Sequence, residues 1–244
     1  MIKKIVKHLH RISRARRFNV EFVRRASFKT PATIRVNGKA VPLAFPNEEG
    51  AMIDFLTCFI DDEYGLSKVQ FPVDTVLDIG ANIGFFSMAA RSYFSNAKIH
   101  CYEPNPRALQ YLTKNAETVK FDLYKEAVGS KAGFVTVDDS GDSNQVKTRP
   151  AGESGMRIPM ASLATAVERL GGRVDIAKID CEGAEWDMFT DPAAWTGIQN
   201  LRMEYHLWGR HTFGEVQGAM SMIGFDIDHH SPSGEWGTIW AHKV

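Results

Sequence analysis

The chain has 244 residues, of which 44% are hydrophobic and 24% are charged, and this balance excludes wholesale disorder. No apolar run approaches the roughly 18–20 residues that span a bilayer, so a transmembrane helix is not expected. The three widely spaced cysteines argue against a disulfide framework and against a Cys-x-x-Cys metal site, and they favour a reducing, cytoplasmic location.

The net charge of zero conceals a basic N-terminal arm, residues 1–30. The arm holds ten of the 29 lysines and arginines but a single acid, Glu21, which leaves 19 basic and 28 acidic residues in the rest of the chain. Apolar residues recur in it at helical spacing and predict an amphipathic helix: Ile2, Ile5, Val6, Leu9 and Ile12.

Several roles stay open for this arm. It can pack on the acidic body of the protein, or attach the protein peripherally to an anionic membrane surface. A mitochondrial presequence is also compatible with the first 20 residues, which are rich in arginine and free of acids. Nucleic-acid binding is disfavoured, because the segment has few aromatic side chains on which bases would stack.

Residues 31–70 are expected to form an N-terminal extension that packs on the core. Residues 33–36 and 40–44 are typical of short strands around the turn signal Asn37-Gly38, and residues 50–60 are typical of a short helix.

Strands and helices alternate from residue 71 to residue 244, which predicts one further domain. Strands are expected at 75–79, 98–103, 122–128, 174–180 and 201–206, and helices at 84–94, 106–118, 162–170, 184–189 and 213–223. Two more strands are expected at 134–138 and 158–161, a polar mobile loop at 140–155, and a final antiparallel hairpin at 225–229 and 238–242. The alternation predicts an α/β, Rossmann-like, doubly wound and mainly parallel sheet.

The most informative stretch is VLDIGANIGFFS, residues 76–87. A buried strand ends at Asp78-Ile79, a glycine turn runs from Gly80 to Gly84, and a helix opens there. Ligands of open α/β sheets bind at the carboxyl ends of the strands, so the loop is expected to contact a cofactor. Its spacing differs from the Gly-x-Gly-x-x-Gly dinucleotide fingerprint, and no Gly-Lys-Ser/Thr follows to form a phosphate-binding loop.

A second acid follows the next strand, which ends in CYEPNP, residues 101–106. Glu103 comes 25 residues after Asp78, near the spacing of an acid that binds ribose hydroxyls. A glycine loop with an upstream acid suits an ammonium group better than a diphosphate, which favours S-adenosylmethionine over a nicotinamide cofactor. The alternative is that Glu103 only caps the helix that begins at Pro106.

Together with EAVG (126–129) and KIDCEGAEWDMF (178–189), these motifs resemble the FkbM-type methyltransferases, a family of the class I S-adenosylmethionine-dependent enzymes. The resemblance covers roughly residues 72–244 and implies a class I methyltransferase domain over 71–244. The chain departs from the family pattern at Ala164, where the family has an acid, and in its basic arm.

The resemblance implies O-methylation of a hydroxyl group on a sugar or another small natural-product molecule. It also implies that Asp78, Gly80 and Gly84 surround the methionine part of the cofactor, that Glu103 holds the ribose, and that Asn105 and the Ala127 backbone lie at the adenine. Asn82, between the two glycines, is a further candidate cofactor-binding residue.

Acids and one histidine follow the later strands. Glu204 and His206 are two residues apart on one strand and therefore face the same way, above the cofactor crevice with Asp180. We predict that His206 is the general base, that Asp180 holds the acceptor and that Glu204 orients the histidine. The alternatives are that Asp180 is the base, or that Glu204 and His206 only satisfy each other. Asp180, Glu182 and Glu204 are also candidate oxygen ligands for Mg²⁺.

Two other function classes stay open: an NAD-type oxidoreductase and a membrane-tethered, noncatalytic binding module on the same fold. A nucleic-acid substrate is disfavoured, because residues 180–183 lack the stacking ring of base-amine methyltransferases and carry extra negative charge. The expected partner is therefore a small hydroxylated molecule, whose identity the sequence does not specify.

Overall fold

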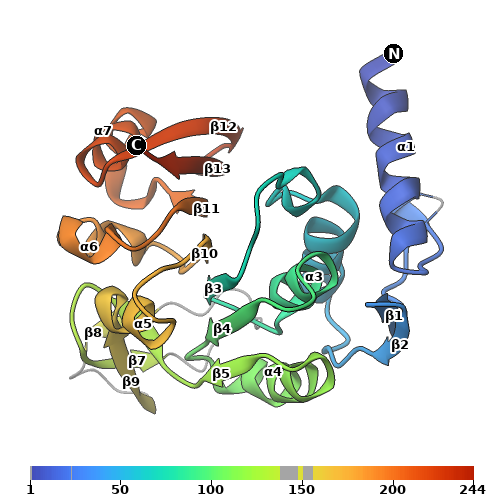
Figure 1. Cartoon of the computed structure of the whole chain (residues 1–244), viewed down its shortest axis with the longest axis horizontal. Helices are drawn as coiled ribbons and strands as arrows, with labels where there is room; N and C mark the ends of the chain where they lie inside the picture. The colour runs from blue at the N-terminus through green and yellow to red at the C-terminus, as the bar shows by residue number, and fades with distance from the viewer. Residues whose placement is uncertain (1, 23, 138–147, 151–155) are drawn as a thin grey trace.

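The structure, a computed structural model, describes every residue except 1, 23, 138–147 and 151–155 (Figure 1). Its central feature is a seven-stranded sheet. Five strands run parallel: β3 (Thr75–Ile79), β4 (Lys98–Tyr102), β5 (Asp122–Tyr124), β10 (Ile176–Ile179) and β11 (Asn200–His206). Two antiparallel strands, β12 (Phe225–Ser233) and β13 (Trp236–Lys243), complete one edge, and the order is β12-β13-β11-β10-β3-β4-β5.

Helices cover both faces of this sheet (Figure 1). One face carries α3 (Phe85–Tyr93) and α4 (Pro106–Val119), and the other carries α5 (Leu163–Arg169), α6 (Glu185–Met188) and α7 (Phe213–Met222). The central strands β3 and β10 are mostly apolar because both of their faces are buried, and each contains one buried charged residue, Asp78 and Lys178. The predicted doubly wound α/β fold with a C-terminal antiparallel hairpin is confirmed.

The order of the strands creates a crevice beside β3. The chain passes from β3 outward to β4 and β5, and then returns to form β10 on the other side of β3. Loops that leave the carboxyl ends of β3 and β10 therefore diverge, which is where open α/β sheets bind ligands.

The sequence prediction for residues 122–128 is wrong, because this stretch forms two strands in different sheets. After β5 the chain turns at Lys125-Glu126, where Glu126 forms an ion pair of 2.8 Å with Arg169 of α5. The next strand, β6 (Ala127–Gly129), joins a second sheet with β9 (Met156–Ser162), β7 (Gly133–Val137) and β8 (Thr148–Pro150), in the order β6-β9-β7-β8.

The strand β8 lies within the segment predicted to be a mobile loop and pairs with β7. The rest of that predicted loop, residues 140–147 and 151–155, lies outside the described residues, as does the last residue of the strand predicted at 134–138.

The N-terminal segments share one hydrophobic core with the sheet. They comprise α1 (Ile2–Arg17), the hairpin β1 (Thr33–Val36) and β2 (Lys39–Pro42), and α2 (Glu49–Phe55), which continues as the π-helix η2 (Leu56–Asp61). The rings of Phe55 and Phe59 pack 5.7 and 5.6 Å from that of Phe85 on α3. Short 3-10 helices complete the elements: η1 (Arg25–Ser27), η3 (Leu66–Lys68), η4 (Pro192–Trp195) and η5 (Trp208–Arg210).

None of the helices in the described part of the chain combines the length and the apolar character needed to cross a bilayer.

Candidate active site

A cavity of about 560 Å³ lies at the carboxyl ends of β3, β4, β10 and β11. Its volume falls within the range of small-molecule sites, roughly 300–1,000 Å³. Residues that directly follow these strands line it, and further wall comes from α2, η2 and the turn after η2, together with residues of α3, β6, η5 and β13. The N-terminal extension is therefore part of the site.

The glycine loop passes directly against the segment that follows β10. Gly80 has a φ of +72°, and a Cβ atom placed on it would lie 1.6 Å from the carbonyl oxygen of Asp180. Only glycine tolerates both this backbone conformation and this approach. Asn82, two residues further along the same turn, also has a positive φ, of 47°. The loop is thus held open toward the cavity.

Two of the predicted cofactor residues, Asp78 and Gly84, are not among the residues that line the cavity. Asp78 is fully buried behind the loop, where one carboxylate oxygen accepts a hydrogen bond of 2.7 Å from the Ser87 hydroxyl. Gly84 caps α3 with a φ of +87°, and a Cβ atom on it would lie 2.6 Å from the Leu112 side chain. Both residues shape the loop from outside the cavity.

Glu103 lines the cavity and is only 6% exposed. Its two carboxylate oxygens accept hydrogen bonds of 2.7 Å from the backbone N–H groups of Asn82 and Asn105. Burial raises the pKa of Glu103 from 4.5 to about 7, although these two hydrogen bonds and Lys178 act in the opposite direction. The helix cap of α4 is the side chain of Asn105, which accepts from the Arg107 N–H at 3.0 Å, so capping does not explain Glu103.

The wall of the cavity also presents a hydrogen-bond acceptor. The side-chain oxygen of Asn82 is buried and has no hydrogen-bond partner among the described residues, while its amide nitrogen donates to Asp54 at 2.7 Å. A buried acceptor of this kind favours a ligand that carries an N–H or O–H donor. The predicted cofactor residues that line the cavity are Gly80, Asn82, Glu103, Asn105 and Ala127.

Lys178 and Asp54 also line the cavity, and neither was predicted from the sequence. The Lys178 ammonium donates to the carbonyl oxygen of Gly80 and lies 3.5 Å from a carboxylate oxygen of both Asp78 and Asp180. Burial lowers the pKa of Lys178, but Asp180 and Asp78 outweigh burial and raise it, so the side chain stays charged. This one cation therefore connects the glycine loop to two acids.

Asp54 comes from α2 and faces the same cavity. Burial, and then the negative charge of Asp180, raises its pKa to about 7. The sequence held a signal for it, because Asp54 is the only charged residue in the run 51–60. A lone acid inside an apolar helix is costly unless a partner or a ligand compensates it.

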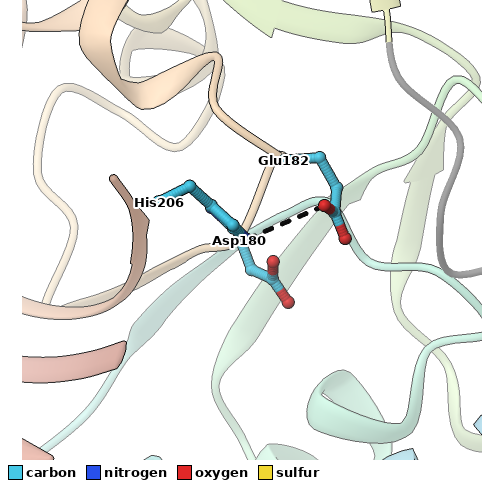
Figure 2. A group of neighbouring side chains, drawn as sticks. All are labelled: Asp180, Glu182 and His206. Atoms are coloured by element: carbon cyan, nitrogen blue, oxygen red, sulfur yellow. Dashed lines mark ion pairs between the residues drawn. The ribbon is translucent and has the colours of Figure 1, made fainter. Parts of the chain in front are cut away.

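The predicted catalytic residues Asp180, Glu204 and His206 all line the cavity. The Nδ1 atom of His206 lies 3.1 Å from a carboxylate oxygen of Glu185, and Nε2 lies 3.4 Å from a carboxylate oxygen of Glu204. Nε2 also lies 3.7 Å from a carboxylate oxygen of Glu182, the ion pair drawn in Figure 2. Burial lowers the pKa of His206, but hydrogen bonds to Glu185 and Glu204 outweigh burial and raise it to about 10. With its pKa raised in this way, the histidine is an imidazolium at neutral pH.

Glu204 is the carboxylate that lies 3.4 Å from Nε2 of His206. Burial, and then the charge of Asp180, raises its pKa to about 8, while His206 acts in the opposite direction. The carboxylate of Glu185 is fully buried and also accepts the backbone N–H groups of Gly183 and His206, at 2.9 and 2.8 Å. It orients the imidazole from the side opposite the cavity acids.

Asp180, Glu182 and His206 place their ligand atoms within 4.8 Å of one another and form a candidate metal site (Figure 2). The predicted set of Asp180, Glu182 and Glu204 contained oxygen donors alone. A site with an imidazole nitrogen suits transition metals, whereas Mg²⁺ is bound through oxygens. The donor set therefore does not fit the predicted Mg²⁺.

Known proteins share this fold. A family model described as the methyltransferase FkbM domain matches residues 78–231. The fibrillarin pre-rRNA processing protein of Methanococcus jannaschii is similar over 92% of this chain and 86% of its own, with 11% identity and a TM-score of 0.50.

Two further solved structures are similar at low identity. A methyltransferase FkbM from Methylobacillus flagellatus has 15% identity and a TM-score of 0.49 over 82% of this chain and 56% of its own. A ribosomal protein L11 methylase from Lactobacillus delbrueckii has 14% identity and a TM-score of 0.48 over 83% of this chain and 82% of its own. No curated protein matches the sequence.

Proposed function

The chain belongs to the FkbM methyltransferase family, and from this premise we propose that it transfers a methyl group from S-adenosylmethionine to a hydroxyl group of a sugar or another small natural-product molecule. The observation that carries the proposal is the shared cavity. Residues suited to the cofactor, among them Glu103 and Asn82, line the same space as the acids Asp180 and Glu204. Membership of a methyltransferase family argues against the alternative that the protein is an NAD-type oxidoreductase.

The cofactor-facing residues fit S-adenosylmethionine by their chemistry. This cofactor supplies, when bound, a methyl group on a positively charged sulfur. Glu103 would accept hydrogen bonds from the ribose hydroxyls, and the side-chain oxygen of Asn82 would accept one from the ammonium group. The carboxylates of Asp180 and Glu182 lie in the same cavity, where they favour a positively charged ligand over the diphosphate of a nicotinamide cofactor.

Asp180 is the residue that would receive the acceptor's proton. The bound cofactor would supply the electrophilic methyl group, and the Asp180 carboxylate, which lines the cavity, would take up the proton that the acceptor hydroxyl loses. His206 does not suit this task at neutral pH, because both ring nitrogens already carry protons. We assign His206 to positioning, since its two ring nitrogens hold Glu185 and Glu204.

The proposal is tested with methyl-labelled S-adenosylmethionine and a panel of hydroxylated sugars and natural products. At least one acceptor should gain a labelled methyl group on oxygen, identified by mass spectrometry and nuclear magnetic resonance. Cofactor binding with no transfer to any acceptor would favour the noncatalytic binding module. Transfer to nitrogen or carbon alone would reject O-methylation.

Removal of divalent metals provides a second prediction. The rate on the true acceptor should be the same with and without a chelator, because no residue in the proposed mechanism acts through a metal. Adding back each metal after chelation is the matched control. A rate that the chelator abolishes and a single metal restores would instead assign a metal to Asp180, Glu182 and His206.

Glu103 gives a third prediction, on cofactor affinity and its pH dependence. A charge-assisted hydrogen bond contributes about 1.5–3 kcal/mol, so Glu103→Ala should weaken S-adenosylmethionine binding by roughly 10- to 150-fold. The folded-state pKa of Glu103 is raised to about 7, so the carboxylate is lost as the pH falls through that value. Wild-type affinity, measured by calorimetry, should therefore decrease below pH 7.

The matched control is Glu103→Gln, which keeps the size of the side chain and removes its titration. This variant should bind weakly with a flatter pH profile. If it binds as tightly as the wild-type protein, Glu103 does not hold the ribose. If it binds weakly but keeps the wild-type pH profile, the titrating group is another acid, such as Asp54.

A further inference from the structure

The basic helix α1 is attached to the rest of the protein by its arginines. The Arg11 guanidinium forms two hydrogen bonds with the Asp61 carboxylate at the end of η2. Arg14 donates to the carbonyl oxygens of Ile60 and Asp61 at 2.7 and 3.0 Å, and Arg17 donates to the carbonyl of Ser92 at 2.7 Å. The basic face of the helix is therefore the docked face.

The apolar stripe of α1, formed by Ile5, Val6 and Leu9, lies on the opposite side. These side chains are 53%, 43% and 57% exposed. Successive residues of an α-helix are about 100° apart, so Leu9 lies about 200° from Arg11, and Ile5 about 180° from Arg14. Figure 1 shows the first turns of α1 extending beyond the rest of the chain. An amphipathic helix that packs on its own protein normally buries its apolar face, and this one does not.

We propose that this stripe is a docking surface for an anionic membrane, into whose headgroup region Ile5, Val6 and Leu9 insert. The charge of the arm selects this partner, because Lys7, Arg16, Arg24, Arg25 and Lys29 are exposed in addition to the arginines that hold α1 to the protein, and residues 1–30 contain a single acid. Pairing of two copies along the stripe would bring two such arms together and is opposed by their charge. A nucleic acid would satisfy the charge and leave the stripe in water. An anionic bilayer surface satisfies both features.

The attachment of α1 also determines what membrane docking does to the rest of the enzyme. The π-helix η2 binds α1 through Asp61 and lines the cavity through Thr57 and Cys58. Glu63 is a further cavity residue, and burial raises its pKa. The charge of Lys7 on α1 acts on the pKa of Glu63 in the opposite direction. Docking would therefore attach the protein through the helix that contacts the cavity wall, without involving the cofactor-binding residues.

The test compares the wild-type protein with the double variant Ile5→Asp, Leu9→Asp. Flotation with vesicles of phosphatidylcholine and phosphatidylglycerol should carry the wild-type protein, whereas vesicles of phosphatidylcholine alone should not. The double variant should lose roughly 100-fold or more in partitioning, since two buried aliphatic side chains are replaced by charges. High salt should weaken wild-type binding, because it screens exposed charges.

Met222→Asp is the matched control, because Met222 is 57% exposed on α7 and lies outside the arm. It should float as the wild-type protein does. The double variant should keep the wild-type melting temperature and S-adenosylmethionine affinity. Deletion of the arm is not an equivalent test, because Phe18 and Phe28 lie in the hydrophobic core.

Four results would overturn the proposal. The first is a wild-type protein that ignores phosphatidylglycerol vesicles at low salt, and the second is a double variant that binds them unchanged. The third is a wild-type dimer in solution that the double variant converts to a monomer, which would make the stripe a contact between copies. A fall in melting temperature in the double variant would show that the stripe is buried and would reject it equally.

Discussion

Asp180→Asn is expected to lower kcat by about 10²–10⁴-fold, the usual contribution of a general base, with little change in S-adenosylmethionine affinity. Asparagine preserves the size of the side chain and its ability to accept from the Tyr64 hydroxyl, which lies 3.4 Å from Asp180. It removes the carboxylate that would receive the proton of the acceptor hydroxyl. Single-turnover measurement with labelled cofactor separates this loss from any effect on product release.

His206→Gln is the informative comparison for Asp180. Glutamine retains a donor toward Glu185, whose carboxylate would otherwise be left buried without its cation. If His206 acts by positioning, this variant should lose clearly less activity than Asp180→Asn, and part of the loss should appear in KM for the acceptor. A larger loss in the histidine variant than in the aspartate variant, at an unchanged melting temperature, would restore His206 as the base.

Which of Asp180 and His206 acts as the general base could not be predicted from the sequence. The two-residue spacing of Glu204 and His206 along one strand predicted that they share a face, and in the structure both line the cavity. The protonation state of His206, however, depends on Glu185, 21 residues earlier in the chain and buried against the ring. A histidine between carboxylates behaves differently from a free imidazole, and only tertiary packing brings those carboxylates to it.

The same limit applies to the cofactor end of the site. The glycine loop and Glu103 were predicted because their chemistry is local: a strand, a tight turn and an acid after the next strand. Asp54 reaches the loop through its hydrogen bond to Asn82, 28 residues later, and this contact depends on how α2 packs on α3. Asp78 was expected to face the ligand, but Ser87 and Lys178 hold it behind the loop.

For the fold, continuous apolar runs and the alternation of strand and helix predicted the parallel sheet, because burial on both faces imposes that pattern. The break between β5 and β6 carries no comparable hydrophobic signal. It depends on Glu126 turning out of the sheet to pair with Arg169, 43 residues away. For α1, the sequence predicted an amphipathic helix, but the choice of docked face depends on where Asp61 and the carbonyl groups of η2 lie.

Gly80→Ala is expected to destabilise the fold and to abolish cofactor binding. An L-residue in a left-handed conformation costs about 1–2 kcal/mol, and this is the smaller of two effects. The added Cβ would lie 1.6 Å from the carbonyl oxygen of Asp180, a backbone atom that no side-chain rotation can move. Either the glycine loop or the segment after β10 must shift, and both line the cavity. With total stabilities of about 5–15 kcal/mol, such a shift should markedly lower the melting temperature.

Gly171→Ala separates the two effects, because Gly171 has a φ of +94° but nothing within 4 Å of its Cβ position. It carries the conformational cost without the clash, so it should lower the melting temperature only modestly and leave S-adenosylmethionine affinity unchanged. Thermal unfolding and calorimetry on both variants measure the difference. Equal losses in the two variants would mean that the loop can move away from Asp180, and the close approach of Gly80 to that strand end would then not be what shapes the site.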